Sequence, residues 1–395
     1  MRWIRQTFAV MMLGVRTVPQ RLSSSIVALV GVAGVVVVLV SVLSISEGFR
    51  AALVGAGAPD RAIVLRNGSD SEMTSGLLGT ETDIIKQAPG LKVVNNRPLA
   101  AAEMYVIVDL NKRSTGTPAN VPIRGIEPES LLIRDEVQIV EGRAPAFGTN
   151  EAIVGAAAER QFAGVELGTD YVSGQLKLKI VGVFTDRGSS AESEIWCDAH
   201  VLQGAYKRGN SYQAVLAKLD TPASLDTFKN WLTTNPQLNV NVRRESDYYA
   251  AQTQVMTDLI NGIGFTIAGL MAIGAVFSAI LTMYTAVATR TREIATLRAL
   301  GFNTSSVLVS VLGESMVLAA VGGAIGGLIA YLGFNGYETA TMNFQTFSQV
   351  AFAFAVTPRL IVGGLAGALL MGFIGGCPPA INAARLPIAT ALRQL

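Results

Sequence analysis

Residues 22–46 read LSSSIVALVGVAGVVVVLVSVLSIS and carry no charged side chain. A helix rises about 1.5 Å per residue, so about 20 apolar residues cross a hydrocarbon core roughly 30 Å thick. The stretch therefore predicts a transmembrane helix. A cleaved signal peptide is the alternative interpretation, but the apolar run is longer than usual for one, and the Ala-Gly-Ala at 56–58 is followed by Pro59.

Further apolar stretches extend this prediction to four spans. The composition agrees, because 50% of the 395 residues are hydrophobic and only 15% are charged, with a mean hydropathy of +0.42. Such values are typical of a membrane protein. The additional predicted spans are Leu259–Thr289, Ser305–Phe334 and Leu360–Ala384.

The positions of the arginines predict the orientation of the spans, because cytoplasmic flanks are rich in Lys and Arg. The segments 1–21, 290–304 and 385–395 hold most of the arginines near the predicted helix ends. We therefore expect both termini in the cytoplasm, and residues 47–258 and 335–359 outside it. The formal net charge of +2 argues against a nucleic-acid-binding protein.

Residues 47–258 have the composition of a folded α+β domain, with short β-branched runs separated by Gly, Pro and Asn. Strand-helix-strand patterns occur near its start and its end, which predicts two halves, about 60–120 and 209–245, that pack together. An inserted subdomain is expected at about 121–208. The polar stretch 245–258 is expected to be a helix that continues into the second span. The predicted elements are strands 62–66, 91–95, 137–140, 176–184, 194–197, 212–219 and 238–243, and helices 81–87 and 224–231.

One crowded group of ionisable residues in this domain leaves two interpretations open. It is either a metal site or a solvated loop and strand edge. The two cysteines, Cys197 and Cys377, are predicted to lie in different compartments, which excludes a disulfide between them. No set of nucleophile, base and orienting residue is evident, which disfavours a membrane-anchored enzyme. The crowded residues are Asp186, Glu192, Glu194, Asp198 and His200.

Residues 288–302 read ATRTREIATLRALGF. This pattern predicts a short amphipathic helix with Ile294, Leu297 and Leu300 on one face, closed by Gly301 as a C-cap. A short cytoplasmic helix with an apolar face either binds a partner protein or rests on anionic lipid headgroups.

The predicted spans contain glycine patterns and one acidic residue. Without side chains, helix backbones approach closely and pack in lipid, so these glycines predict helix-helix contacts. Glu314 in span three is either an interhelical polar contact or a packing hydrogen bond to Ser or Thr. Four spans are few for a transport pathway, so a dimer is expected. The glycines are Gly322, Gly323, Gly326 and Gly327 in span three, and Gly363, Gly367, Gly372 and Gly376 in span four.

Two motifs carry a resemblance to a known family. The first is the loop pattern R-x-R-E-I-A-x-L-R-A-L-G at 290–301, and the second is a C-terminal run. With these motifs the sequence resembles the MacB/FtsX-like permease subunits of ABC transporters, including the LolC/LolE-type and DevC-like proteins. The resemblance implies four transmembrane helices with a MacB-like α+β extracytoplasmic domain between helices 1 and 2, built from porter-like halves and an inserted subdomain. The C-terminal run reads Pro378-Pro379-Ala380, Ala384-Arg385-Leu386-Pro387 and Ala391-Leu392-Arg393.

The resemblance also implies that Arg290–Gly301 is a coupling helix that docks on a cytosolic ATPase, with Arg292, Glu293, Leu297 and Arg298 at the contact. These 395 residues contain no G-x-x-x-x-G-K-[ST] motif for binding phosphates. We therefore expect a separate ATPase subunit to bind ATP and Mg²⁺, with no cofactor and no catalytic residue in this chain.

The expected function is that of a permease subunit in the bacterial inner membrane, which exports a substrate by mechanotransmission. The expected partners are the ATPase, a second permease copy or related permease, membrane lipid, and a periplasmic adaptor with an outer-membrane channel. Two alternatives stay open: LolC/LolE-like lipoprotein extraction, and FtsX-like signalling to an envelope enzyme without transport. The large loop favours the MacB-like interpretation, because FtsX-type outside domains are smaller.

Overall fold

The computed structural model of the chain describes residues 22–385 and Pro387. The described residues form two compact units: unit 1 contains 22–47, Leu259–Tyr337 and 354–385, and unit 2 contains Gly48–Asp258 and Glu338–Ala353. The expected cytoplasmic segment 1–21 lies outside the described residues, as do Leu386 and the final motif Ala391-Leu392-Arg393.

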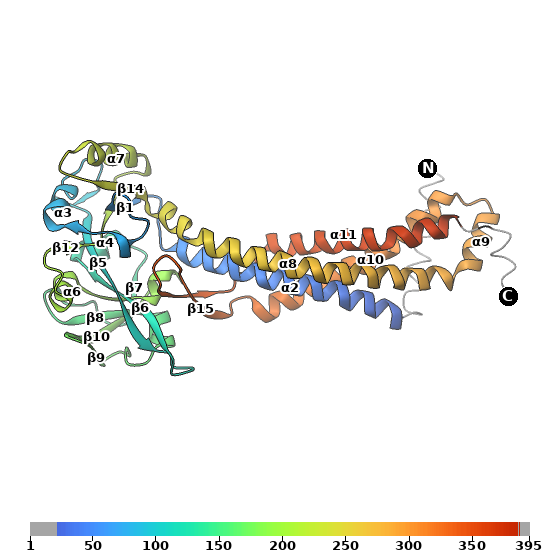
Figure 1. Cartoon of the computed structure of the whole chain (residues 1–395), viewed down its shortest axis with the longest axis horizontal. Helices are drawn as coiled ribbons and strands as arrows, with labels where there is room; N and C mark the ends of the chain where they lie inside the picture. The colour runs from blue at the N-terminus through green and yellow to red at the C-terminus, as the bar shows by residue number, and fades with distance from the viewer. Residues whose placement is uncertain (1–21, 386, 388–395) are drawn as a thin grey trace. The chain divides into compact units, whose positions relative to one another are not determined.

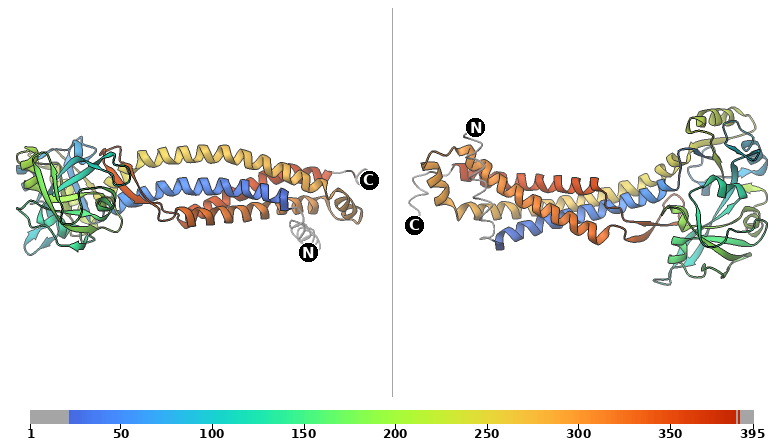
Figure 2. Two further views of the ribbon diagram at one scale, coloured as in Figure 1. Left: turned by 90° about the horizontal axis from the view of Figure 1, so that it is seen from below. Right: turned by 180° about the vertical axis from the view of Figure 1, so that it is seen from behind.

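Unit 1 is a bundle of long helices that run side by side in all three views (Figures 1 and 2). Four of them are long and apolar enough to cross a membrane, which confirms the predicted fold class. The short helix α9 lies at one end of the bundle, between α8 and α10. The helices are α2 (Leu22–Gly55), α8 (Glu245–Ala288), α9 (Thr291–Ala299), α10 (Thr304–Phe334) and α11 (Pro358–Arg385).

Two of these helices extend beyond the predicted spans. At about 1.5 Å per residue, the 44 residues of α8 cover about 66 Å, roughly twice the thickness of a hydrocarbon core. The helix begins at Glu245 in unit 2, and the polar lead-in at 245–258 is helical as expected. The helix α2 likewise begins in unit 1 and ends in unit 2, so each of these two helices belongs to both units without a break.

Unit 2 is built on a 10-stranded mixed sheet with the order β14-β1-β13-β5-β6-β11-β8-β10-β7, and β9 pairs with β10. The pairs β6–β11 and β8–β10 are parallel, and the other printed pairs of this sheet are antiparallel. The strands are β1 (Arg61–Arg66), β5 (Ala100–Asn111), β6 (Pro118–Ile126), β7 (Gln138–Gly142), β8 (Glu151–Gly155), β9 (Asp170–Ser173), β10 (Leu176–Thr185), β11 (Ile195–Asp198), β13 (Ala214–Lys218) and β14 (Val240–Arg244).

The two ends of the unit 2 chain pack together. Strand β1 lies between β13 and β14, and pairs with both. One core forms on this side around Phe228 and Leu232, and a second forms around Ile123 and Phe162 in the middle segment. The long strand β5 pairs with β13 on one edge and with β6 on the other, so a single sheet carries both cores.

Short helices pack against this sheet. The small pairs β2–β12 and β3–β4 lie apart from the main sheet. The helices are α3 (Gly79–Ile85), α4 (Pro128–Ile133), α5 (Ala156–Gln161), α6 (Ala199–Tyr206) and α7 (Leu225–Thr234), with 3₁₀ turns at Glu72–Thr74, Ser190–Ser193 and Pro222–Ser224. The small strands are β2 (Leu77–Leu78), β3 (Val93–Val94), β4 (Arg97–Pro98) and β12 (Ser211–Tyr212).

The segment between α10 and α11, expected as a short loop, folds as a hairpin of β15 (Glu338–Met342) and β16 (Gln349–Ala353) that belongs to unit 2. Its hydrogen bonds reach several elements of that unit. Asn120 Nδ2 donates to the Phe347 carbonyl at 2.8 Å, and the Ala351 amide donates to Ser193 Oγ at 2.9 Å. The chain thus leaves the helix bundle after α10, contributes to the α+β domain, and returns to begin α11.

Candidate functional site

The helix α9 forms where the sequence predicts a short helix, and its end is set by Gly301. This glycine has a φ of +90°, a left-handed conformation that L-residues with a side chain rarely adopt. The Phe302 amide donates to the Leu297 carbonyl, and the Gly301 amide donates to the Arg298 carbonyl, both at 3.1 Å. These two bonds form a Schellman motif, so the expected glycine C-cap is present.

The two faces of α9 have different surroundings. Ile294 and Ala295 are buried, and Ile294 belongs to a cluster that includes Met283 of α8 and Val307 of α10. Arg292 and Glu293 are exposed, and Leu297 and Arg298 are half-buried. The helix is therefore fixed to the bundle through one face and leaves charged side chains accessible on the other.

The expected single apolar face of Ile294, Leu297 and Leu300 is wrong. Ile294 is 8% exposed and Leu300 is 73% exposed. At about 100° per residue, positions six apart lie about 120° from each other around the helix axis, so Leu300 is turned well away from the buried side of Ile294. Leu300 is also the C-cap residue, at the end of the last turn. The exposed surface of α9 therefore combines Leu300 with Arg292 and Glu293.

Arg290 and Glu314, which are far apart in the sequence, meet beside the start of α9. Arg290 Nη1 lies 3.1 Å from Glu314 Oε2, and the two side chains are 16% and 7% exposed. The neighbouring Ser315 Oγ donates to the Gly372 carbonyl of α11 at 2.7 Å. Glu314 thus makes a polar contact to a segment outside α10, with an arginine as partner.

The glycines of α10 form two contact faces. A Cβ added at Gly322 or Gly326 would meet α2, at 3.0 Å from the Leu29 carbonyl oxygen and at 2.6 Å from the Ala33 carbonyl oxygen. A Cβ added at Gly323 would instead meet Ala368 of α11 at 2.7 Å. The overlapping G-x-x-x-G patterns therefore pack one helix against two neighbours within the same chain.

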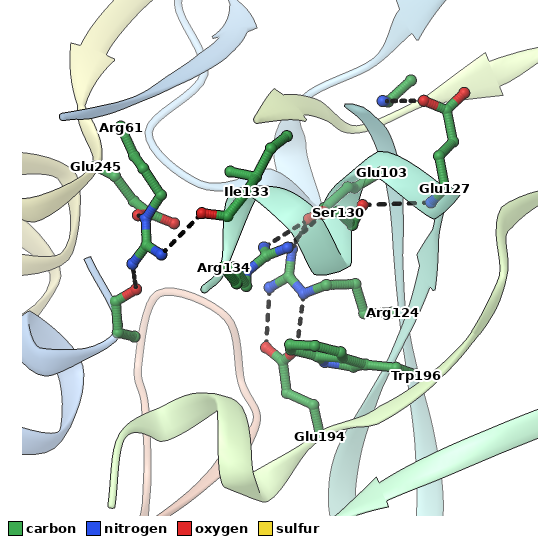
Figure 3. A network of polar contacts seen from close by, with 12 residues as sticks. Arg61, Glu103, Arg124, Glu127, Ser130, Ile133, Arg134, Glu194, Trp196 and Glu245 are labelled. Carbon is green, nitrogen blue, oxygen red and sulfur yellow. Dashed lines mark hydrogen bonds and ion pairs between the residues drawn. The ribbon is translucent and has the colours of Figure 1, made fainter. Parts of the chain in front are cut away.

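A buried cluster of charges lies in unit 2, and the sequence analysis missed it (Figure 3). Arg124 of β6 donates to Glu72 at 2.5 Å, to Glu103 at 2.9 Å and to Glu194 at 2.7 Å. Arg134 donates to both oxygens of Glu103, at 2.6 and 2.8 Å. All five side chains are less than 10% exposed.

Ion pairing outweighs the effect of burial on the pKa values of Glu103 and Arg124. Burial alone would raise the pKa of Glu103, but Arg134 and Arg124 outweigh burial and lower that pKa to about 2. Burial alone would lower the pKa of Arg124, but its carboxylate partners raise it well above the usual value. Glu103 and the two arginines are thus held in their charged forms. The cluster joins elements that are distant in the sequence.

A second buried pair connects the ends of the two long helices within unit 2. Arg61 Nε donates to Glu245 Oε2 at 2.5 Å, and Arg61 Nη2 donates to the Ala56 carbonyl at 2.9 Å. The Ala58 amide also donates to Glu245 Oε2, at 3.2 Å. Burial, only partly offset by Arg61, raises the pKa of Glu245. The residues just after α2 are thereby tied to the first residue of α8.

The crowded group at 186–200 is neither a metal site nor a solvated edge. Within residues 22–385 no group of three or more His, Cys, Asp or Glu side chains is placed to hold a metal ion. Glu194 binds Arg124, and Asp198 caps the N-terminus of α6. Glu192 accepts the backbone amide of Asp186 at 2.8 Å. The Asp186 carboxylate accepts from Ser189 Oγ. All four carboxylates are buried, so they satisfy protein donors instead of facing solvent.

Two families of known proteins match this chain, one over its first part and one over its last part. Residues 25–235 match the MacB-like periplasmic core domain, and residues 265–388 match the FtsX-like permease C-terminal family. The macrolide export ATP-binding/permease protein MacB 1/2 of Paracoccus denitrificans is 24% identical over 93% of this chain and 55% of its own length. The chain thus spans about half the length of this relative.

Two further similarities concern parts of the chain. The uncharacterized ABC transporter permease YknZ of Bacillus subtilis is 32% identical over 36% of this chain and 32% of its own length. The crystal structure of the periplasmic region of MacB from Actinobacillus actinomycetemcomitans matches with 10% identity and a TM-score of 0.38, covering 49% of this chain and 92% of that one.

Proposed function

Since this chain belongs to the MacB/FtsX-like family of ABC transporter permeases, we propose that it couples ATP hydrolysis by a separate cytosolic ATPase to movement of its α+β domain. The movement drives export of a substrate across the envelope. ATP and Mg²⁺ bind to the ATPase, and this chain transmits force. It lies in the bacterial inner membrane as a multi-pass protein, with its termini and α9 in the cytoplasm.

The surface of α9 is the observation that carries this proposal. A nine-residue helix is too short to be stable alone in water, so its conformation depends on packing. Ile294 provides that packing against the bundle, while Arg292, Glu293 and Leu300 stay accessible. A rigidly held helix with an apolar residue beside two charges is suited to dock on a protein partner.

The transmission path follows the continuous helices. Force applied to α9 reaches α8 directly, because only a short turn separates Ala288 from Thr291. The helix α8 enters the α+β domain, where Glu245 is tied to Arg61. Separating Arg61 from Glu245 would leave a buried charge without its partner, so the pair resists being pulled apart. Movement of α8 is thereby transferred to β1 and to the sheet.

The hairpin β15–β16 supplies a second connection to the same domain. It continues directly from α10 and into α11, and Tyr105 Oη donates to Ser348 Oγ at 3.3 Å. All four spans therefore transmit movement to the domain: α2 and α8 directly, and α10 and α11 through the hairpin. A second permease copy or a related permease completes the transport unit, and a periplasmic adaptor with an outer-membrane channel receives the substrate.

The test uses the full chain purified together with its ATPase. We expect Leu300→Asp, and the pair Leu297→Asp with Arg298→Glu, to remain in the membrane but to lower co-purification of the ATPase at least tenfold. Leu132→Asp is the matched control, because Leu132 is 58% exposed in the α+β domain. Unchanged co-purification and unchanged stimulation of ATPase activity in both α9 variants would contradict the proposal.

A further inference from the structure

The ion pair between Arg290 and Glu314 lies at a position where a charge needs a specific partner. Glu314 lies about 15 Å along α10 from its start at Thr304. An uncompensated carboxylate inside a membrane-spanning segment is costly, so such groups turn toward protein partners. Here the side chain is 7% exposed and its carboxylate is 3.1 Å from the guanidinium of Arg290.

Arg290 is the N-cap residue of α9, where its own charge is unfavourable. The N-terminus of a helix carries a partial positive charge, so a cation there is repelled and an anion is attracted. No side-chain hydrogen bond caps this helix end. The carboxylate of Glu314 neutralises the arginine and brings a negative charge to the same end. The pair therefore favours the start of α9 at this point of the chain.

The other end of α9 is connected to the same helix, α10. The Schellman motif at Gly301 ends α9, and α10 begins after Asn303, whose carbonyl accepts the Ser306 amide at 2.9 Å. Its middle is held by Ile294 in the cluster with Val307. With the ion pair at its start, α9 is held to α10 at its beginning, middle and end.

We propose that Glu314 is a positioning residue for α9: through Arg290 it fixes the direction in which α9 presents Arg292, Glu293 and Leu300 to the ATPase. This inference rests on the proposed function, since it concerns the efficiency of coupling at the same surface. Glu314 does not touch the ATPase. Loss of the pair leaves the docking residues in place but lets the start of α9 move relative to α10, so force is transmitted less completely.

The test compares variants of the full chain in the purified complex. We expect Glu314→Gln and Arg290→Gln to keep ATPase co-purification within about twofold, and to lower the stimulated kcat for ATP at least fivefold with KM unchanged. The reversed pair, Arg290→Glu with Glu314→Arg, restores at least half of the stimulation. Ser315→Ala is the control, because it removes a neighbouring buried hydrogen bond of α10 and leaves the ion pair intact.

A distance measurement separates positioning from a general loss of structure. Spin labels at Thr296 of α9 and at Ser305 of α10, in a Cys377→Ala background in lipid nanodiscs, report the position of α9 without the ATPase. We expect the distance distribution to broaden at least twofold in Glu314→Gln, and not in Ser315→Ala. Should Glu314→Gln fail to accumulate in the membrane, Arg290→Gln serves in its place with the same expected result.

The outcomes distinguish this inference from the proposed function. If Leu300→Asp uncouples the ATPase while the tested ion-pair variant keeps the wild-type kcat and distance distribution, the positioning role is refuted and the coupling surface stands. If Leu300→Asp and the pair Leu297→Asp with Arg298→Glu both leave co-purification and stimulation unchanged, the coupling surface itself is refuted. Equal broadening in Ser315→Ala would also overturn the inference, because the effect would then not depend on the ion pair.

Discussion

Arg124 is the residue on which the buried charges of the α+β domain depend. It contacts Glu72 from a 3₁₀ turn, Glu103 from β5 and Glu194 beside β11, and its guanidinium lies 5.0 Å from the centre of the Tyr105 ring. The planar guanidinium has five N–H donors, which allows one side chain to satisfy several carboxylates. Its removal would take a charged donor from three buried carboxylates, of which Glu103 would keep Arg134 and Glu194 would keep Trp196.

We expect Arg124→Met to lower the free energy of unfolding of the α+β domain by about 3–5 kcal/mol, the usual effect of breaking a buried ion pair. The measurement is denaturant unfolding of the full chain in nanodiscs, followed by tryptophan fluorescence, because Trp196 Nε1 donates to Glu194 in this cluster.

Arg143→Met is the control for this prediction, because Arg143 pairs with Glu151 but is 58% exposed. A solvent-exposed pair contributes about 0–1 kcal/mol. Equal losses of stability in the two variants would mean that the buried cluster contributes no more than a surface pair.

The helix α10 packs against two other helices of the bundle through its glycines. Gly322 and Gly326 form the face toward α2, and Gly323 and Gly327 form the face toward α11. Because a missing Cβ lets backbones approach, both neighbours gain van der Waals contact with the same helix. Gly363 of α11, by contrast, has no heavy atom within 4 Å of an added Cβ among the described residues.

We expect Gly326→Val to destabilise the bundle by about 1–3 kcal/mol, the usual cost of forcing extra volume into a packed site. The added atoms would collide with the backbone of α2 at Ala33, which cannot move without moving the helix. Gly363→Val, with the same change in an open position, is expected to have little effect. The resistance of the full chain to unfolding in SDS measures both, and equal resistance would refute the two-face arrangement.

The long helices could be predicted from the sequence, whereas the central strands could not. Apolar runs such as 259–289 give a direct signal, because a bilayer imposes both length and composition. Strand β5 begins Ala-Ala-Ala-Glu-Met-Tyr, which lacks β-branched residues, and β6 contains two prolines, so neither has the local pattern of a central strand. Both segments become strands through their pairing with each other and with neighbouring strands.

The charged cluster was missed because its members are separated by long stretches of sequence. Glu72, Glu103, Arg124 and Glu194 have no common spacing, and only the folded sheet brings them together. A weak signal was present: Glu103 and Arg124 each interrupt an otherwise apolar run, and a lone charge in a buried strand requires a partner. The position of α9 was predictable, but the burial of Ile294 was not, because it depends on three other helices.

At the scale of the whole molecule, the chain passes between its two units at four places. Two lie within the continuous helices α2 and α8, and two lie at the arms of the hairpin β15–β16. Every long helix is thus joined covalently to the α+β domain. In the proposed function, this connectivity lets a force applied at α9 reach the domain through the whole bundle.

In the proposed function, α9 receives this force from an ABC ATPase. Placing a photo-crosslinking amino acid at position 300, and a matched one at position 132, tests it most directly in intact cells. We expect position 300 to form a covalent product with an ABC ATPase and position 132 to form none. A product of position 300 with proteins outside the cytoplasm, and none with an ATPase, would contradict it.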